Sequence, residues 1–142
     1  MKQQWLLGIP CLLTLLLLSA CGGTPYNAAG SQRVLVKLSE YKINTSLTSF
    51  VPGKPYHFMV MNIGQTTHEF MIMPKVEGIT SNTSMGNMHM ISLASVENIS
   101  PGETKFLDYT FPPSASESHP QFACYYPGHY EAGMKQDVKV SS

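Results

Sequence analysis

Short runs of strand-forming residues, separated by turns rich in proline and glycine, constrain the fold of this 142-residue chain most strongly. Tyr56, Phe58 and Val60 alternate with His57, Met59 and Met61, which is the two-residue period of a half-buried strand. The expected strands are 34–38, 56–62, 69–73, 103–111, 121–125 and 136–140. These six runs, in a domain long enough for about seven or eight short strands, predict an all-β domain, an antiparallel β-sandwich with Greek-key connections.

One segment, 75–98, departs from this pattern. It is rich in Ser, Asn, Gly and Met and has no strand period, so we expect a long excursion with one helical turn.

Composition and charge exclude several classes of protein. The chain carries 9 basic and 9 acidic side chains, so no net charge favours nucleic acid or an anionic surface as a partner. Apolar residues make up 43% and charged residues 13%, which suits a single folded domain better than a disordered chain. We expect this domain to be a monomer.

The N-terminal residues 1–20 have the features of a bacterial export signal. Lys2 precedes an apolar run whose densest part, 12–18, is shorter than the roughly 20 residues that a membrane-spanning helix needs. The sequence LSACG, which ends at Gly22, resembles a lipobox, in which Cys21 is acylated and becomes the first residue of the mature protein. We therefore expect a lipoprotein anchored to a bacterial membrane outside the cytoplasm, periplasmic or on the outer face. Ordinary cleavage, which would give a soluble protein, is the alternative.

Residues 21–33 then read as a lipid-anchored flexible linker, small and polar, and the folded domain occupies 34–142. Cys11 leaves with the signal and Cys21 carries the lipid, so Cys124 is the one cysteine of the predicted domain. An unpaired thiol in an exported protein calls for a use, because such compartments are oxidising.

The segment FACYYPGHYEAGM supplies that use, since Cys124, His129 and Met134 follow one another at five-residue intervals. A strand that ends at Cys124 and a loop that turns at Pro127–Gly128 can bring the three side chains together. His68, at the start of an expected strand, can complete a His₂Cys set with a weak axial Met. Thiolate, imidazole and thioether together suit both Cu(I) and Cu(II), so we predict a site for one type 1 copper ion.

These residues resemble the cupredoxins, the small blue copper proteins such as plastocyanin, rusticyanin and auracyanin. The resemblance covers the whole predicted domain: an Asn-x-Gly turn at 62–64, a His–Glu–Phe strand start at His68, and a C-x4-H-x4-M loop. It implies a Greek-key β-sandwich and copper ligands at His68, Cys124, His129 and Met134. Many cupredoxins have an Asn after the first His, where this chain has Glu69.

The resemblance also implies an electron carrier rather than an enzyme. Single electrons would pass through the exposed edge of His129, which Tyr125, Tyr126 and Tyr130 surround in sequence. A cytochrome or a membrane oxidase or reductase would be the redox partner, and the lipid tether would hold the domain near it.

Copper buffering, delivery or resistance is the alternative function, and the cluster SMGNMHM supports it. Met85, Met88 and Met90 could hold Cu(I), or could simply cover the end of the sandwich, since Met often fills irregular surfaces. His57 and His119 are expected to be ordinary residues, because nothing pairs them with the ligand set. A cysteine-nucleophile enzyme is disfavoured, because no third group is evident that would orient a catalytic His.

Overall fold

A computed structural model describes residues 30–75 and 85–142 of the chain. The predicted signal peptide, Cys21 and most of the predicted linker lie outside these residues. Within the described ranges, no helix is long and apolar enough to cross a membrane.

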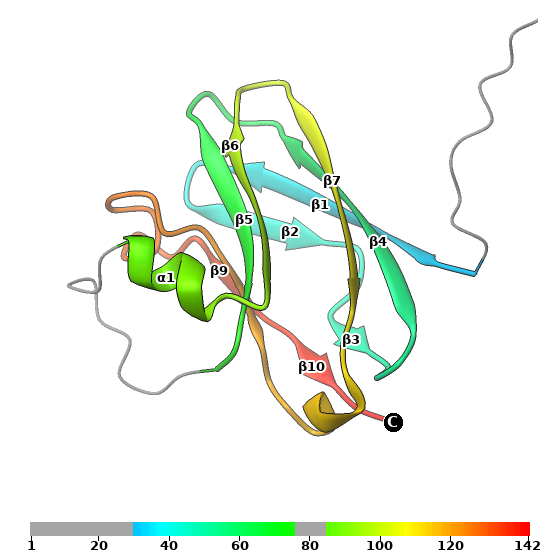
Figure 1. Cartoon of the computed structure of the whole chain (residues 1–142). Coiled ribbons are helices and arrows are strands. Elements are labelled where there is room, and N and C mark those ends of the chain that lie inside the picture. The colour runs from blue at the N-terminus through cyan, green and yellow to red at the C-terminus, as the bar shows by residue number, and fades with distance from the viewer. Residues whose placement is uncertain (1–29, 76–84) are drawn as a thin grey trace, which may run out of the picture.

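Two four-stranded sheets face each other and enclose the core (Figure 1). The first sheet has the order β2 (Lys42–Thr45), β1 (Gln32–Ser39), β4 (Pro55–Asn62), β7 (Thr104–Thr110). The second has the order β6 (Ala94–Ile99), β5 (His68–Met73), β8 (Gln121–Ala123), β9 (Lys135–Asp137). The short strands β3 (Ser49–Phe50) and β10 (Lys139–Val140) pair with each other. The expected β-sandwich is therefore confirmed.

The sandwich is not purely antiparallel, which differs from the prediction. Strand β4 runs parallel to β1, and β3 runs parallel to β10, whereas the other pairs are antiparallel. A parallel pair needs a crossover of about a dozen residues. Residues 40–54 supply it, because β2 and β3 return the chain to the starting end of β1 before β4 begins.

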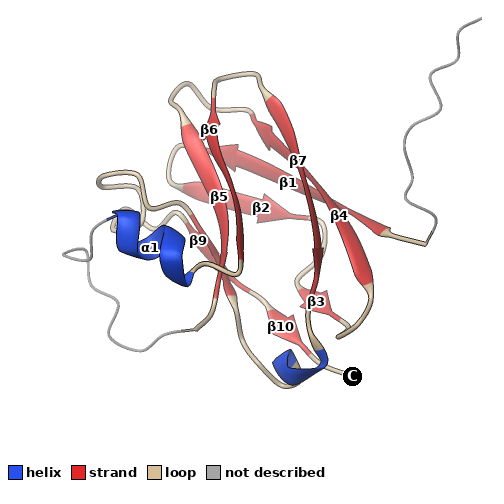
Figure 2. Ribbon diagram, viewed as in Figure 1, coloured by secondary structure: helices blue, strands red, loops and turns tan. Residues whose placement is uncertain are grey.

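Most predicted strands are present, and three strands were missed. The predicted segment 136–140 proves to be two strands, β9 and β10, which belong to different sheets. The missed strands are β2, β3 and β6. Strand β6 was expected to be part of the irregular excursion because its sequence, ASVENI, lacks an apolar alternation. In the structure it is an edge strand whose residues are mostly half-buried or exposed. The expected helical turn is the helix α1 (Met85–Ile91), and Figure 2 shows it beside β5.

The strand β5 is buried on both faces, unlike its neighbours. Phe70 and Ile72 point into the main core between the sheets, where the Phe70 ring contacts the rings of Phe58 and Phe122. The intervening residues Met71 and Met73 lie on the opposite face and pack with Met88 of α1. Ala123 of β8, together with Tyr125 and Tyr130 of the loop that follows β8, completes this smaller cluster. Helix α1 therefore acts as a third layer over one end of the second sheet.

The loop between β4 and β5 is held by one buried amide. The Asn62 Nδ2 group donates to the backbone carbonyls of Thr66 and Ile99 at 2.7 and 2.8 Å, and its Oδ1 accepts the Gly64 N–H at 2.9 Å. These three bonds set the course of the chain immediately before β5 starts at His68.

The substitution Asn62→Ala should destabilise the metal-free domain by about 3 kcal/mol, because it leaves three backbone groups without their partners. Asn44→Ala on the exposed face of β2 is the control and should change stability by less than about 0.5 kcal/mol. Urea unfolding followed by fluorescence measures both. Equal effects of the two substitutions would contradict the structural role of Asn62.

Candidate metal centre

The predicted site residues come from two neighbouring strands and the loop that follows one of them. His68 is the first residue of β5, and Cys124 follows directly after β8. Both strands lie side by side, with Met71 opposite Ala123, so the start of β5 and the end of β8 meet at one end of the sandwich. His129 and Met134 lie on the loop that joins β8 to β9.

Backbone hydrogen bonds fold this loop back on itself. The Cys124 N–H donates to the Met134 carbonyl at 3.2 Å, and the Met134 N–H donates to the His129 carbonyl at 3.0 Å. Gly128 and Gly133 have φ angles of 82° and 103°, which residues with a side chain rarely adopt, and they let the loop turn sharply on both sides of His129.

Three of the four predicted ligands converge at this end. The Nδ1 atoms of His68 and His129 are 3.2 Å apart, and the Cys124 Sγ is 3.4 Å from the His129 Nδ1. The candidate ligand atoms of all three lie within 4.8 Å of one another. No other group of three or more His, Cys, Asp or Glu ligand atoms comes together in this way among the described residues.

The donor set fits a transition-metal ion. Bonds of about 2.0–2.3 Å to one ion place neighbouring donors about 3–4 Å apart, as they are here. Each neutral imidazole has only one N–H, so the two Nδ1 atoms and the sulfur cannot all satisfy one another by hydrogen bonds. Their lone pairs are better explained as ligands that point at one cation. One thiolate and two imidazoles form a set that suits copper.

Met134 lies beside these donors, fully buried in the same core cluster as Cys124. Its backbone is hydrogen-bonded to both Cys124 and His129, which fixes its position in the loop relative to theirs. The role of its thioether as an axial ligand stays a prediction.

Burial shapes the protonation of the site. It raises the pKa of the Cys124 thiol to about 11, despite backbone hydrogen bonds that act in the other direction. Burial, together with the nearby charge of His129, lowers the pKa of His68. At neutral pH the metal-free site therefore contains a protonated thiol and a neutral His68, so a cation that binds there displaces the thiol proton.

Glu69 has a definite structural role. This fully buried carboxylate accepts the N–H of Tyr125, the residue after Cys124, at 2.7 Å. Its second oxygen accepts no hydrogen bond from the residues that the structure describes, but the His89 Nε2 atom of α1 lies 3.5 Å away, and the His89 Nδ1 atom is 3.1 Å from Glu97. Burial raises the pKa of Glu69. Glu69 thus connects the backbone next to Cys124 with helix α1.

The remaining sequence candidates lie elsewhere. His57 stacks on Phe106 and forms a 2.6 Å contact with Asp108, and neither His57 nor His119 joins the cluster of three ligands. In the Met cluster, Met88 is buried beneath α1, whereas Met90 is 83% exposed. The two side chains therefore cannot act as one continuous patch.

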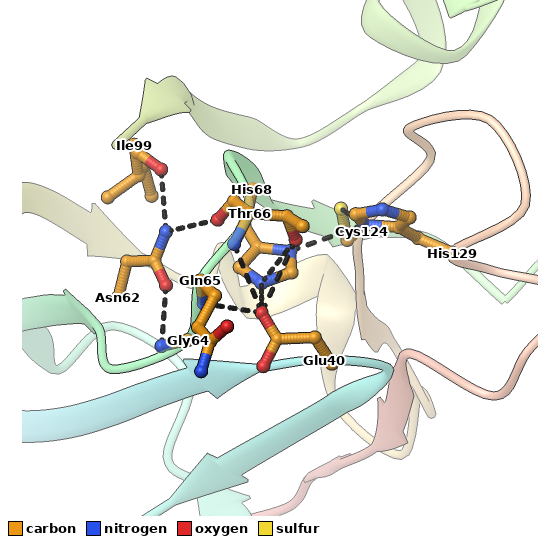
Figure 3. A network of polar contacts seen from close by, with 9 residues as sticks. All are labelled: Glu40, Asn62, Gly64, Gln65, Thr66, His68, Ile99, Cys124 and His129. Carbon is orange, nitrogen blue, oxygen red and sulfur yellow. Dashed lines mark hydrogen bonds and ion pairs between the residues drawn. The ribbon is translucent and has the colours of Figure 1, made fainter. Parts of the chain in front are cut away.

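Figure 3 shows contacts around His68 that sequence reasoning missed. Glu40, in the turn between β1 and β2, reaches the loop before His68, and its neighbour Tyr41 packs edge-on against His129 with ring centroids 5.5 Å apart. The Asn-x-Gly pattern predicted a turn in the loop that Glu40 contacts. Nothing in the sequence distinguished Glu40 from any other charged residue in a turn.

The chain is similar to two curated copper proteins. It is 35% identical over 91 residues to the "Copper-resistant cuproprotein CopI" of Vibrio cholerae, a match that spans 63% of this chain and 52% of that protein. It is 28% identical over 127 residues to the protein of the same name from Rubrivivax gelatinosus, over 83% of this chain and 72% of that one. The chain thus spans about half of the first relative. No protein-family model matches it.

Solved structures give a match over most of the described chain. Auracyanin from Roseiflexus castenholzii superposes with a TM-score of 0.62 and 18% identity, over 80% of this chain and all of that one. Rusticyanin from Thiobacillus ferrooxidans gives 0.59 and 16%, over 79% of this chain and 78% of its own. With its two packed sheets and its His–Cys–His cluster, the chain has the fold of the cupredoxins.

Proposed function

We propose that this protein holds one type 1 copper ion with His68, Cys124 and His129, with Met134 as a weak axial ligand, and carries single electrons outside the cytoplasm. The observation that carries the proposal is the convergence of two Nδ1 atoms and one Sγ atom, all within 4.8 Å, at one end of a cupredoxin fold. Copper bound there would supply a one-electron Cu(II)/Cu(I) couple.

The surroundings of the two His ligands suit this role. His68 is fully buried, whereas His129 is only partly buried and contacts Tyr41 and Tyr126 edge-on. Tyr41 is 51% exposed and Ile63, in the adjoining loop, is 56% exposed. His129 therefore offers a partner an approach to the site beside two aromatic side chains, and such an exposed ligand edge suits brief contacts with a redox protein. The lipid on Cys21 would keep the domain near such a partner at the membrane.

Copper buffering, delivery or resistance is the second candidate, and two observations favour it. Both curated relatives are named as copper-resistant cuproproteins, and Met90 presents a thioether to solvent. Against a cuprous patch, Met88 is buried with Met71 and Met73, where it packs α1 onto the sheet. The two functions differ in whether the protein holds more than one copper and passes copper on.

The domain from residue 34 onward should turn blue or green when one equivalent of Cu(II) is added, because thiolate bound to Cu(II) gives an intense charge-transfer band. Cys124→Ser should abolish the colour. Met134→Gln should keep the colour but lower the reduction potential, because an oxygen ligand favours Cu(II). Visible spectroscopy and protein-film voltammetry measure these effects. A coloured Cys124→Ser protein would sink the assignment of the site.

The thiol of the metal-free protein should be almost unreactive at neutral pH. Since burial raises the pKa of Cys124 from 9.0 to about 11, its thiolate fraction at pH 8 is about one hundredth of that in the unfolded chain. Alkylation should therefore be slow at pH 8, accelerate as the pH rises towards 11, and become fast in urea at any of these pH values. A native protein that is alkylated at pH 8 as fast as the unfolded one would contradict this protonation state.

Replacing Met85, Met88 and Met90 together with Leu separates the two functions, because Leu keeps the apolar bulk and removes the sulfur donors. Under electron transfer, the variant should keep one copper, its spectrum and its self-exchange rate. Titration with Cu(I) against a competing chelator provides the measurement, and Met88→Leu alone is the packing control. A second Cu(I) equivalent that only the triple variant loses would favour copper handling.

A further inference from the structure

We propose that Glu40 is a positioning residue of the metal centre: it orients His68 from behind and, through that ring, strengthens the preference of the site for the oxidised ion. The inference rests on the proposed copper site. It adds a residue from the β1–β2 turn, which contributes no ligand.

The carboxylate of Glu40 is held by the loop that leads into β5. Its Oε1 atom accepts the backbone N–H groups of Gln65 and Thr66 at 2.5 and 3.1 Å, and the Thr66 hydroxyl lies 3.4 Å away (Figure 3). The Gln65 N–H lowers the pKa of Glu40 below its ordinary value, so the group is charged at neutral pH. Two consecutive N–H groups that point at one oxygen form a small anion-binding nest.

Gly64 provides the space for this contact. A Cβ atom at position 64 would lie 2.5 Å from the Glu40 Oε1 and 2.9 Å from the Oε2, so any side chain there would displace the carboxylate. Asn62 fixes the same loop from the core side, through the Gly64 N–H and the Thr66 carbonyl. The loop is thus hydrogen-bonded to Asn62 on its core side and to Glu40 on its other side.

The carboxylate lies behind the ligand ring. His68 turns its Nδ1 towards His129, so its Nε2 faces away from the metal centre, 3.5 Å from the Thr66 Oγ1 and 3.9 Å from the Glu40 Oε1. At 3.9 Å the carboxylate makes no hydrogen bond to the ring. It acts on His68 through its charge, which makes a ligating imidazole more basic, and through the Thr66 hydroxyl, which contacts both groups. The His68 ring is fully buried, so a fixed negative charge on this side favours the ion with the higher positive charge.

The same turn also contacts the second His ligand. Tyr41, whose φ of 60° gives the turn its shape, packs edge-on against His129. The Glu40–Tyr41 turn therefore contacts both imidazoles, one through charge and one through an aromatic ring. A change in the turn reaches both ligands without removing either.

The test is a set of three variants of the copper-loaded protein. Glu40→Gln keeps the size and an acceptor oxygen but removes the charge. It should retain one copper and the colour, while the ratio of Cu(II) to Cu(I) affinity falls about tenfold, which raises the potential by about 59 mV. Gly64→Ala should shift the potential in the same direction, and should add little in the double variant with Glu40→Gln because both act on the same carboxylate.

Glu103→Gln is the matched control. The Glu103 side chain is 38% exposed against 40% for Glu40, and it likewise accepts a backbone N–H, that of Ser100, at 2.7 Å. The substitution removes one carboxylate charge, which lies 3.7 Å from the Lys105 Nζ and, among the described residues, contacts no predicted ligand. Its shift should therefore be less than a third of that of Glu40→Gln. Equal shifts would overturn the inference and leave the proposed function intact.

A measurement without metal tests the positioning itself. In metal-free Glu40→Ala, the amides of Gln65 and Thr66 should exchange their hydrogens at least tenfold faster than in the wild type, whereas amides of the β1–β4 pairing keep their rates. Unchanged exchange at both amides would overturn the inference even where copper binding is lost. A wild-type protein that binds no copper would instead refute the proposed function.

Discussion

The metal centre depends on the closure of the ligand loop by its own backbone. The bonds from Cys124 to Met134 and from Met134 to His129 turn eleven residues into a fixed hairpin-like loop, so the loop positions are set before any ion binds. Without these bonds, the entropy of a mobile loop would have to be removed by the ion itself. The chain therefore holds its donors at separations suited to one ion, and such a site needs little rearrangement between two oxidation states.

Strand β5 links this loop to the rest of the molecule. Its core face carries His68 and continues into Phe70 and Ile72, and its outer face carries Glu69. Glu69 binds the backbone next to Cys124 and faces His89 of α1. A buried carboxylate is costly unless it has partners, and these two contacts partly offset that cost. Glu69 thus lies between the ligand loop and helix α1, which contributes no residue to the His68–Cys124–His129 cluster.

Sequence patterns predicted the parts of this structure that leave a periodic or spaced signal. The alternation at Tyr56, Phe58 and Val60 identified a central strand, and the spacing of Cys124 and His129 identified a pair of residues that the structure brings together. Strand β6 and the parallel pairing of β1 with β4 left no such signal, because edge strands need no apolar face and strand direction depends on the whole crossover. The role of Glu40 was not predicted for a similar reason, because its hydrogen-bond partners are backbone groups 25 and 26 residues away in the sequence.

The asymmetry between the two imidazoles bears on the choice of function. His68 is fully buried and contacts Thr66 and Glu40, whereas His129 is only partly buried and packs edge-on against Tyr41 and Tyr126. A protein that hands over its metal must open its ligand set, and a donor anchored on a buried strand resists that motion. A protein that hands over electrons needs only one ligand near the surface and rigidity elsewhere. The described site combines the buried His68 and Cys124 with a partly buried His129, which is the arrangement that the proposed electron transfer requires.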